Sequence, residues 1–206
     1  NLLRQVDLQL ITNLEVVPTY EREHIKWAYW QIGYEESQGD LETNVADYFS
    51  ELGRPNPFEE KREYPVVYLA SLRSAARQAI AAIVNEFGGL VETPGGSHVT
   101  LYNFSTSALL YKRARIIISD NGFQSPGFVS NRLFQALASG GGVVLQQHVD
   151  RLDELTGLKT TKQYQEWSDL DNLRSWIKAF LGEYGAQAKE IAALGTAFVR
   201  EHFSFD

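Results

Sequence analysis

The residues best suited to chemistry gather around one loop and the start of the helix expected after it. The segment Asp120–Asn131 follows an apolar run, and Arg132 comes next, in the first turn of that helix. A helix start offers unpaired N–H groups and a partial positive charge, and an arginine offers a bidentate fork, so both favour an anion such as a phosphate. Gln135, one turn later, is spaced to bind a ribose or sugar hydroxyl, and it equally suits the polar face of the helix. Ser130 and Asn131 can cap this helix with or without a ligand.

The elements that must position these residues are a strand, a loop, a helix and a second strand. The β-branched run in Arg115–Asp120 predicts a buried strand that ends at Gly122. Apolar residues at helical spacing predict a helix from Val129 to Ala138, and Val143–Leu145 predicts the next strand. In open parallel α/β sheets, ligands bind outside the carboxyl ends of the strands. We therefore expect the site at Asp120–Asn131.

A second strand, loop and helix lie earlier in the chain. Pro65–Ala70 predicts a strand, Ser71 a helix cap and Ala75–Phe87 an amphipathic helix. Arg73 or Arg77, at the start of this helix, could pair with a phosphate. The competing interpretation is that both arginines are solvated charges on the helix surface, where the helix macrodipole slightly disfavours them.

The alternation of strands and helices after position 65 predicts an α/β fold with a mostly parallel, doubly wound sheet and helices at its C-terminal end. We expect three regions: 1–33 as the remnant or crossover of another unit, 34–64 as a polar connecting region, and 65–206 as the α/β domain. Further expected strands are Val6–Thr12, Ile25–Ile32, Leu90–Glu92 and the edge strand Leu158–Gln163; further expected helices are Glu15–Glu23, Leu41–Leu52, Ser105–Arg113, Asp150–Leu155, Asp169–Leu181 and Ala186–His202.

Composition excludes several classes of function. A net charge of −7 without a basic stripe argues against nucleic acid as the main partner. The chain has no cysteine, so it has neither disulfides nor thiolate metal sites. No apolar run approaches the roughly 18 residues of a membrane span, and the cytoplasm is the expected location. The chain starts at Asn1 and contains no methionine, which suggests a fragment or a processed product.

Known catalytic and metal-binding motifs are missing from the sequence. The four histidines show no metal-ligand spacing, and only His98, in a Gly-Gly-Ser-His loop, suits a site; a surface histidine is the competing interpretation. There is no Walker loop, no Gly-x-Gly-x-x-Gly and no Gly-x-Ser-x-Gly. From the residues alone, the prediction is an anion-binding α/β domain.

The run from Ser130 to Gly141, SNRLFQALASGG, resembles the donor-site helix of GT-B glycosyltransferases, in particular the bacterial spore-maturation-type group. In that group an Arg-x-Phe-Glu-Ala-x-Ala-x-Gly run precedes a short apolar strand. The resemblance extends to the segments Val6–Gly33, Pro65–Arg77, Tyr111–Asn121, Asp150–Leu155 and Asn172–Phe203.

The resemblance implies that residues 65–206 are the Rossmann-like C-terminal half of a GT-B enzyme, which binds a nucleotide-sugar donor and needs neither a metal nor another cofactor. It implies that Arg73 and Arg132 face the diphosphate and that Gln135 occupies the position of a ribose-binding carboxylate. The acceptor is unknown, and a missing N-terminal half or a partner chain would bind it. The donor-binding residues that we expect are Ser71, Arg73, Asn121, Gly127, Ser130, Asn131, Arg132 and Gln135.

Two other functions remain open at this point. A noncatalytic GT-B-like domain for protein interaction suits the aromatic residues Trp27, Tyr29 and Trp30. A flavodoxin-like regulator ranks lower, because such proteins carry an acidic cluster at the end of the first strand, and Pro65–Ala70 is not followed by one.

Overall fold

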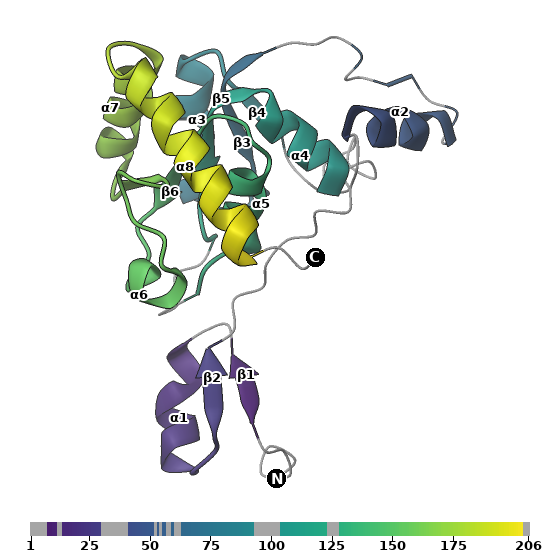
Figure 1. Ribbon diagram of the computed structural model, residues 1–206. Helices are drawn as coiled ribbons and strands as arrows, with labels where there is room; N and C mark the ends of the chain where they lie inside the picture. Colours follow the sequence, from purple (N-terminus) through teal and green to yellow (C-terminus); the bar gives the residue numbers. More distant parts are fainter. Residues whose placement is uncertain are drawn as a thin grey trace.

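The main element of the fold is a five-stranded parallel sheet with helices on both faces (Figure 1). The computed structural model describes residues 8–11, 14–29, 41–51, 53, 55–56, 59, 63–92, 104–122 and 128–203. Within this part of the chain, no helix is long and apolar enough to cross a membrane.

The strand order places a topological switch point in the middle of the sheet. The order is β4-β3-β5-β6-β7, and every neighbouring pair is parallel. From β3 the chain moves outward to β4 and then returns to the other side of β3 as β5, so β3 and β5 flank the switch point, where ligands bind in such sheets. The predicted α/β, Rossmann-like parallel sheet is confirmed. The strands are β3 (Tyr64–Leu69), β4 (Leu90–Glu92), β5 (Ala114–Ser119), β6 (Val143–Gln147) and β7 (Gln165–Trp167).

Two hydrophobic cores cover the two faces of this sheet, because successive side chains of a strand point to opposite faces. Ile116 and Ile118 lie in the core with α3 and α7, and Ile117 lies in the core with α5. Helix α8, yellow in Figure 1, runs across from α7 to α5 and contributes to both cores. The helices are α3 (Ala75–Glu86), α4 (Phe104–Lys112), α5 (Asn131–Ala138), α6 (Leu152–Thr156), α7 (Leu170–Leu181) and α8 (Gly185–Phe203).

The earlier part of the chain forms smaller elements. Two short strands pair in parallel with Gln9 opposite Trp27, and the expected short or broken helix lies between them, with Pro18 in its first turn. The helix α2 packs on α4 through Val45, Phe49 and Leu109. The elements are β1 (Gln9–Ile11), the 3-10 helix η2 (Leu14–Val16), α1 (Val17–Arg22), β2 (Trp27–Tyr29) and α2 (Leu41–Glu51).

Two local predictions are wrong. The expected edge strand Leu158–Gln163 is a turn, because Thr161 has a positive φ of 62° and the side chain of Gln163 accepts from the Lys159 N–H at 2.9 Å. The strand β7 follows this turn. Ser71 does not cap α3, since the chain stays in a loop until Ser74, whose Oγ accepts from the N–H of Arg77 at 3.3 Å.

Gly195 sets how closely α8 approaches the rest of the fold. A Cβ there would overlap the carbonyl oxygen of Gln163 and lie 2.8 Å from Leu137 Cδ2. We expect Gly195→Ala to lower the free energy of unfolding by about 1–2 kcal/mol, because overpacking outweighs the helix propensity gained. Gly185→Ala is the matched control, since the nearest atom to its Cβ would be 3.5 Å away. Urea unfolding of both variants measures the difference; equal stabilities would contradict the close approach.

Candidate functional site

The centre of the candidate site is the carboxylate of Asp120, directly after β5 at the switch point. The Asp120 side chain is 3% exposed and accepts four hydrogen bonds. Oδ1 accepts from Tyr68 Oη at 3.1 Å and from Arg132 Nη1 at 3.2 Å. Oδ2 accepts from Arg77 Nε and from the Gly122 N–H, both at 2.8 Å. A carboxylate has about four acceptor positions, so Asp120 is saturated and suits a positioning residue rather than a proton acceptor.

The two arginines bring an excess of positive charge to this edge of the sheet. The side chain of Arg77 is 17% exposed and that of Arg132 is 25% exposed, so both are partly accessible to solvent, while the side chain of Asp120 is buried. Arg77 also donates from Nη1 to the carbonyl of Ser71 at 3.3 Å. Two guanidinium groups against one carboxylate leave a formal charge of +1, and a guanidinium has five N–H donors. The cluster can therefore bind an anion while Asp120 holds both arginines in place.

Gly122 makes this arrangement possible. Its φ is +74°, a conformation that residues with a side chain rarely adopt, and a Cβ there would overlap the guanidinium of Arg77. The turn after β5 therefore lets its own N–H and the arginine reach the same carboxylate oxygen.

Asn121 ties the end of β5 to the start of α5. Its side-chain amide donates to the carbonyl of Phe128 at 3.2 Å and accepts from the N–H of Ser130 at 3.3 Å. Ser130 is the N-cap of α5, and its Oγ accepts from the N–H of Arg132 at 3.3 Å. The positive end of the α5 macrodipole thus lies beside the arginine cluster, and both features favour an anion.

The other predicted residues take different positions. Ser71 contributes its backbone carbonyl to Arg77, and Asn131 is the first residue of α5. Gln135 is half-buried one turn into that helix. Arg73 is exposed on the loop before α3, and no ion pair joins it to the cluster within the described ranges. Gly127 and His98 lie outside the described residues.

Asp120 lies within the segment predicted to hold the site but was not itself among the predicted site residues. A charged residue directly after three isoleucines was the available signal, because a buried strand end seldom carries an unpaired carboxylate. Tyr68 gave no signal, since an aromatic residue within a buried strand is typical of the core.

Burial has a clear effect on three tyrosines of this domain. It raises the pKa of Tyr68, Tyr111 and Tyr164 far above the ordinary value of 10.0, and the neighbouring charge of Asp120 raises that of Tyr68 further. The unfolded chain therefore loses these protons at a lower pH than the folded chain does.

We expect the free energy of unfolding to be insensitive to these tyrosines below about pH 10 and to fall as pH rises further. Urea unfolding at a series of alkaline pH values measures this fall, and the ultraviolet absorbance of tyrosinate reports when each tyrosine ionises. Replacing Tyr68 with Phe should reduce the slope. Full tyrosinate absorbance in the folded protein would contradict the prediction.

Metal chemistry has no obvious ligand set in the described part of the chain, where no group of three or more His, Asp or Glu side chains could hold an ion. The positive charge at this edge of the sheet comes from the two guanidinium groups.

Comparison with known proteins places the fold. No family model matches the sequence, and no curated protein matches it. Among solved structures, sucrose-phosphate synthase from Thermosynechococcus elongatus is similar, with a TM-score of 0.57, 17% identity and coverage of 98% of this chain and 56% of that one. Anabaena HepE in complex with UDP-glucose is similar with a TM-score of 0.60, 11% identity and coverage of 97% and 60%. Trehalose-phosphate synthase from Burkholderia xenovorans is similar with a TM-score of 0.58, 12% identity and coverage of 95% of this chain and 58% of that one.

The chain has the fold of GT-B glycosyltransferases. It spans less than two thirds of the length of these GT-B neighbours. The predicted fold class is therefore confirmed, and the membership of the spore-maturation-type group stays a prediction.

Proposed function

We propose that this chain is the donor-binding part of a GT-B glycosyltransferase, and that it binds the diphosphate of a nucleotide sugar with Arg77 and Arg132. The observation that carries the proposal is the pair of arginines held by one buried carboxylate at the switch point, beside the start of α5. The structure of HepE is a complex with UDP-glucose, which makes UDP sugars the first ligands to test.

Each part of the site has a role in this proposal. The N–H groups at the start of α5 and the two guanidinium groups neutralise the diphosphate, both in the bound donor and in the leaving nucleotide. Because these groups supply positive charge, transfer proceeds without a metal ion. Gln135, one turn into α5, binds a ribose hydroxyl. Asp120 accepts no proton from the acceptor and serves to orient the arginines.

The acceptor is bound by a part that this chain does not supply alone. The solved GT-B neighbours are longer than this chain, which covers 56% to 60% of their length. We propose that the acceptor site and the group that activates the acceptor belong to an N-terminal half or a partner chain. Membership of the spore-maturation-type group, for which the segment Ser130 to Gly141 argues, is part of the same proposal.

A thermal-shift titration with UDP, GDP, UDP-glucose and GDP-mannose tests donor binding. A ligand at 100 times its Kd stabilises the folded state by about 2.7 kcal/mol, which corresponds to a rise of roughly 5–10 °C in Tm for a domain of this size. We expect this rise with one nucleotide class, and the same rise in the presence of EDTA. A shift that EDTA abolishes would contradict metal independence. The absence of a shift with every nucleotide would favour the noncatalytic interaction domain.

A further inference from the structure

A second feature of the domain lies at the end of the sheet where the strands begin, opposite the arginine cluster. A pocket of about 580 Å³ opens at the amino ends of β5 and β6, where Ala114 and Val143 begin these strands. Its size falls within the range of roughly 300–1,000 Å³ that is usual for small-molecule sites. The proposed nucleotide site is at the carboxyl ends of β3 and β5, so the two sites are distinct.

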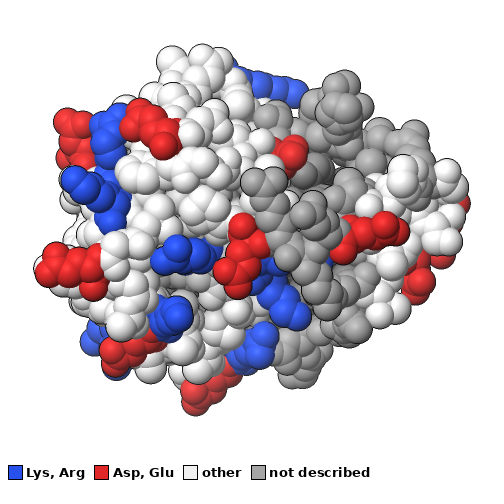
Figure 2. Space-filling view, turned by 90° about the horizontal axis from the view of Figure 1, so that it is seen from above, with Lys and Arg blue, Asp and Glu red and all other residues white. Residues whose placement is uncertain are grey.

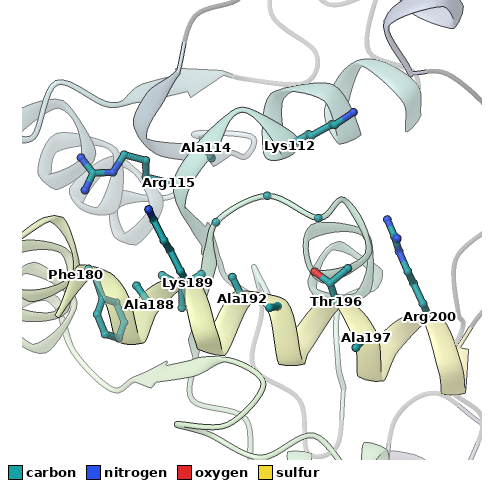
Figure 3. Close-up of a pocket in the computed structure, with 16 residues that line it drawn as sticks. Lys112, Ala114, Arg115, Phe180, Ala188, Lys189, Ala192, Thr196, Ala197 and Arg200 are labelled. Carbon is teal, nitrogen blue, oxygen red and sulfur yellow. The ribbon is translucent and has the colours of Figure 1, made fainter.

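Small residues create the space in this pocket. One wall is the face of α8 that carries Ala188, Ala192, Thr196 and Ala197, as Figure 3 shows. The opposite wall is the turn from Gly140 to Gly142. A Cβ at Gly141 would overlap the carbonyl oxygen of Tyr111, and one at Gly142 would overlap that of Arg115, so this turn needs glycine to pack against the start of β5.

The charged residues in the lining are all basic. Lys112, Arg115, Lys189 and Arg200 line the pocket, and none of the other lining residues is acidic. This contrasts with the chain as a whole, whose net charge is −7. On the face of the molecule seen in Figure 2, acidic and basic side chains of the described residues are interspersed. The lining of the pocket, which carries basic side chains without an acidic one, differs from this mixture.

The two arginines of the pocket, Arg115 and Arg200, bind the carbonyl ends of neighbouring helices. Arg115 Nη2 donates to the carbonyl of Leu181 at the end of α7 at 3.4 Å, and Arg200 Nη2 donates to the carbonyl of Ala138 at the end of α5 at 3.1 Å. Capping of helix ends accounts for part of their presence.

The two lysines have no such structural role. Within the described part of the chain, no ion pair or hydrogen bond joins the ammonium group of Lys112 or Lys189 to another residue. In Figure 3, Lys189 and Arg200 extend from α8 toward the side of the pocket on which Lys112 and Arg115 lie. The four cations thus surround the opening instead of converging on one point, which matches a ligand with several separated negative groups.

We propose that this pocket binds a small ligand that carries two or more phosphate groups. The phosphates contact Lys112 and Lys189, and the walls of alanine and glycine accept the body of the ligand. The interaction is electrostatic and exposed, so its affinity falls as ionic strength rises.

Tripolyphosphate is the probe, and amide chemical shifts in the nitrogen-15 NMR spectrum of the 206-residue chain are the measurement. We expect saturable shifts at Gly141, Gly142 and Thr196, both in the unmodified chain and in Arg132→Ala, whose nucleotide site is impaired. The variant Lys112→Glu/Lys189→Glu should weaken this binding by at least about tenfold, because each lost charge-assisted contact is replaced by a repulsion. Lys159→Glu/Lys162→Glu, two exposed lysines outside the pocket, makes the same change in net charge and should leave the affinity unchanged.

Cosedimentation with phosphatidylcholine vesicles that contain phosphatidylinositol bisphosphate separates a lipid headgroup from a free polyphosphate as the source. Vesicle binding that is lost in Lys112→Glu/Lys189→Glu and kept in Lys159→Glu/Lys162→Glu would assign the phosphates to a lipid. No saturable shift and no vesicle binding would overturn the proposal, and so would equal effects of the two double variants. Arg132→Ala should not affect this pocket, so failure here is distinguishable from failure of the nucleotide site.

Discussion

Replacing Asp120 with Ala should lower the free energy of unfolding by about 3 kcal/mol, the largest stability effect expected from a single substitution at the site. The variant loses all four hydrogen bonds to the carboxylate, leaves the buried Tyr68 hydroxyl without its acceptor and leaves two guanidinium groups side by side. Because both arginines reach solvent, the cost lies at the lower end of the range for broken buried pairs.

Urea unfolding followed by circular dichroism measures this cost. Asp153→Ala removes an exposed carboxylate from α6 and is the matched control, with an expected change within about 0.5 kcal/mol. Asp120→Asn keeps the shape of the side chain and should fall between the two. A loss below about 1 kcal/mol in Asp120→Ala would show that the carboxylate does not hold the cluster together.

The second large effect concerns nucleotide affinity, which should change in opposite directions in two sets of variants. Arg132→Ala and Arg77→Ala each remove a charge-assisted contact to the diphosphate, so the Kd for the preferred nucleotide should rise roughly 10- to 100-fold. Asp120→Asn removes the negative charge that both arginines share, so its Kd should fall by about tenfold.

Isothermal titration calorimetry measures these affinities, and the unfolding curve of each variant shows whether it is folded at the titration temperature. Arg174→Ala is the control, because this arginine pairs with Glu86 on the surface and lies outside the cluster. An affinity that falls in Asp120→Asn as much as in Arg132→Ala would mean that the site had collapsed. Unchanged affinity in both arginine variants would place the nucleotide elsewhere.

The sequence was sufficient to predict those parts of the structure that depend on residues adjacent in the chain. The isoleucines of β5, the glycine after it and the Ser130 cap of α5 are all local signals, and the structure has the strand, the turn and the capped helix there. The doubly wound sheet was predictable for the same reason, since it follows from the alternation of apolar strand segments with amphipathic helix segments along the chain.

Pairings between distant residues could not be predicted in this way. Asp120 contacts Tyr68 across 52 positions and Arg77 across 43, and no local pattern selects these partners. The choice between Arg73 and Arg77 depended on where α3 begins. With Ser74 instead of Ser71 as the cap, Arg77 occupies the third position of the helix and reaches the end of β5.

The basic pocket could not be predicted from local patterns either. Lys112 and Arg200 are far apart in sequence and line the same pocket only because α8 crosses to α5 beside the amino ends of the strands.

The turn at Leu158–Gln163 shows how a local pattern can also mislead. Leu158 is buried as a residue of a strand would be, which favoured an edge strand, but the positive φ of Thr161 prevents a continuous extended segment there.

The most direct test of the central claim is to locate bound nucleotide in the nitrogen-15 NMR spectrum of the chain during a titration with UDP. We predict saturable amide shifts at Asn121, Gly122, Asn131 and Arg132, at UDP concentrations below those that shift Gly141, Gly142 and Thr196. Saturable shifts confined to the second group, or spread over α8 without the first group, would contradict a donor site at the carboxyl ends of β3 and β5.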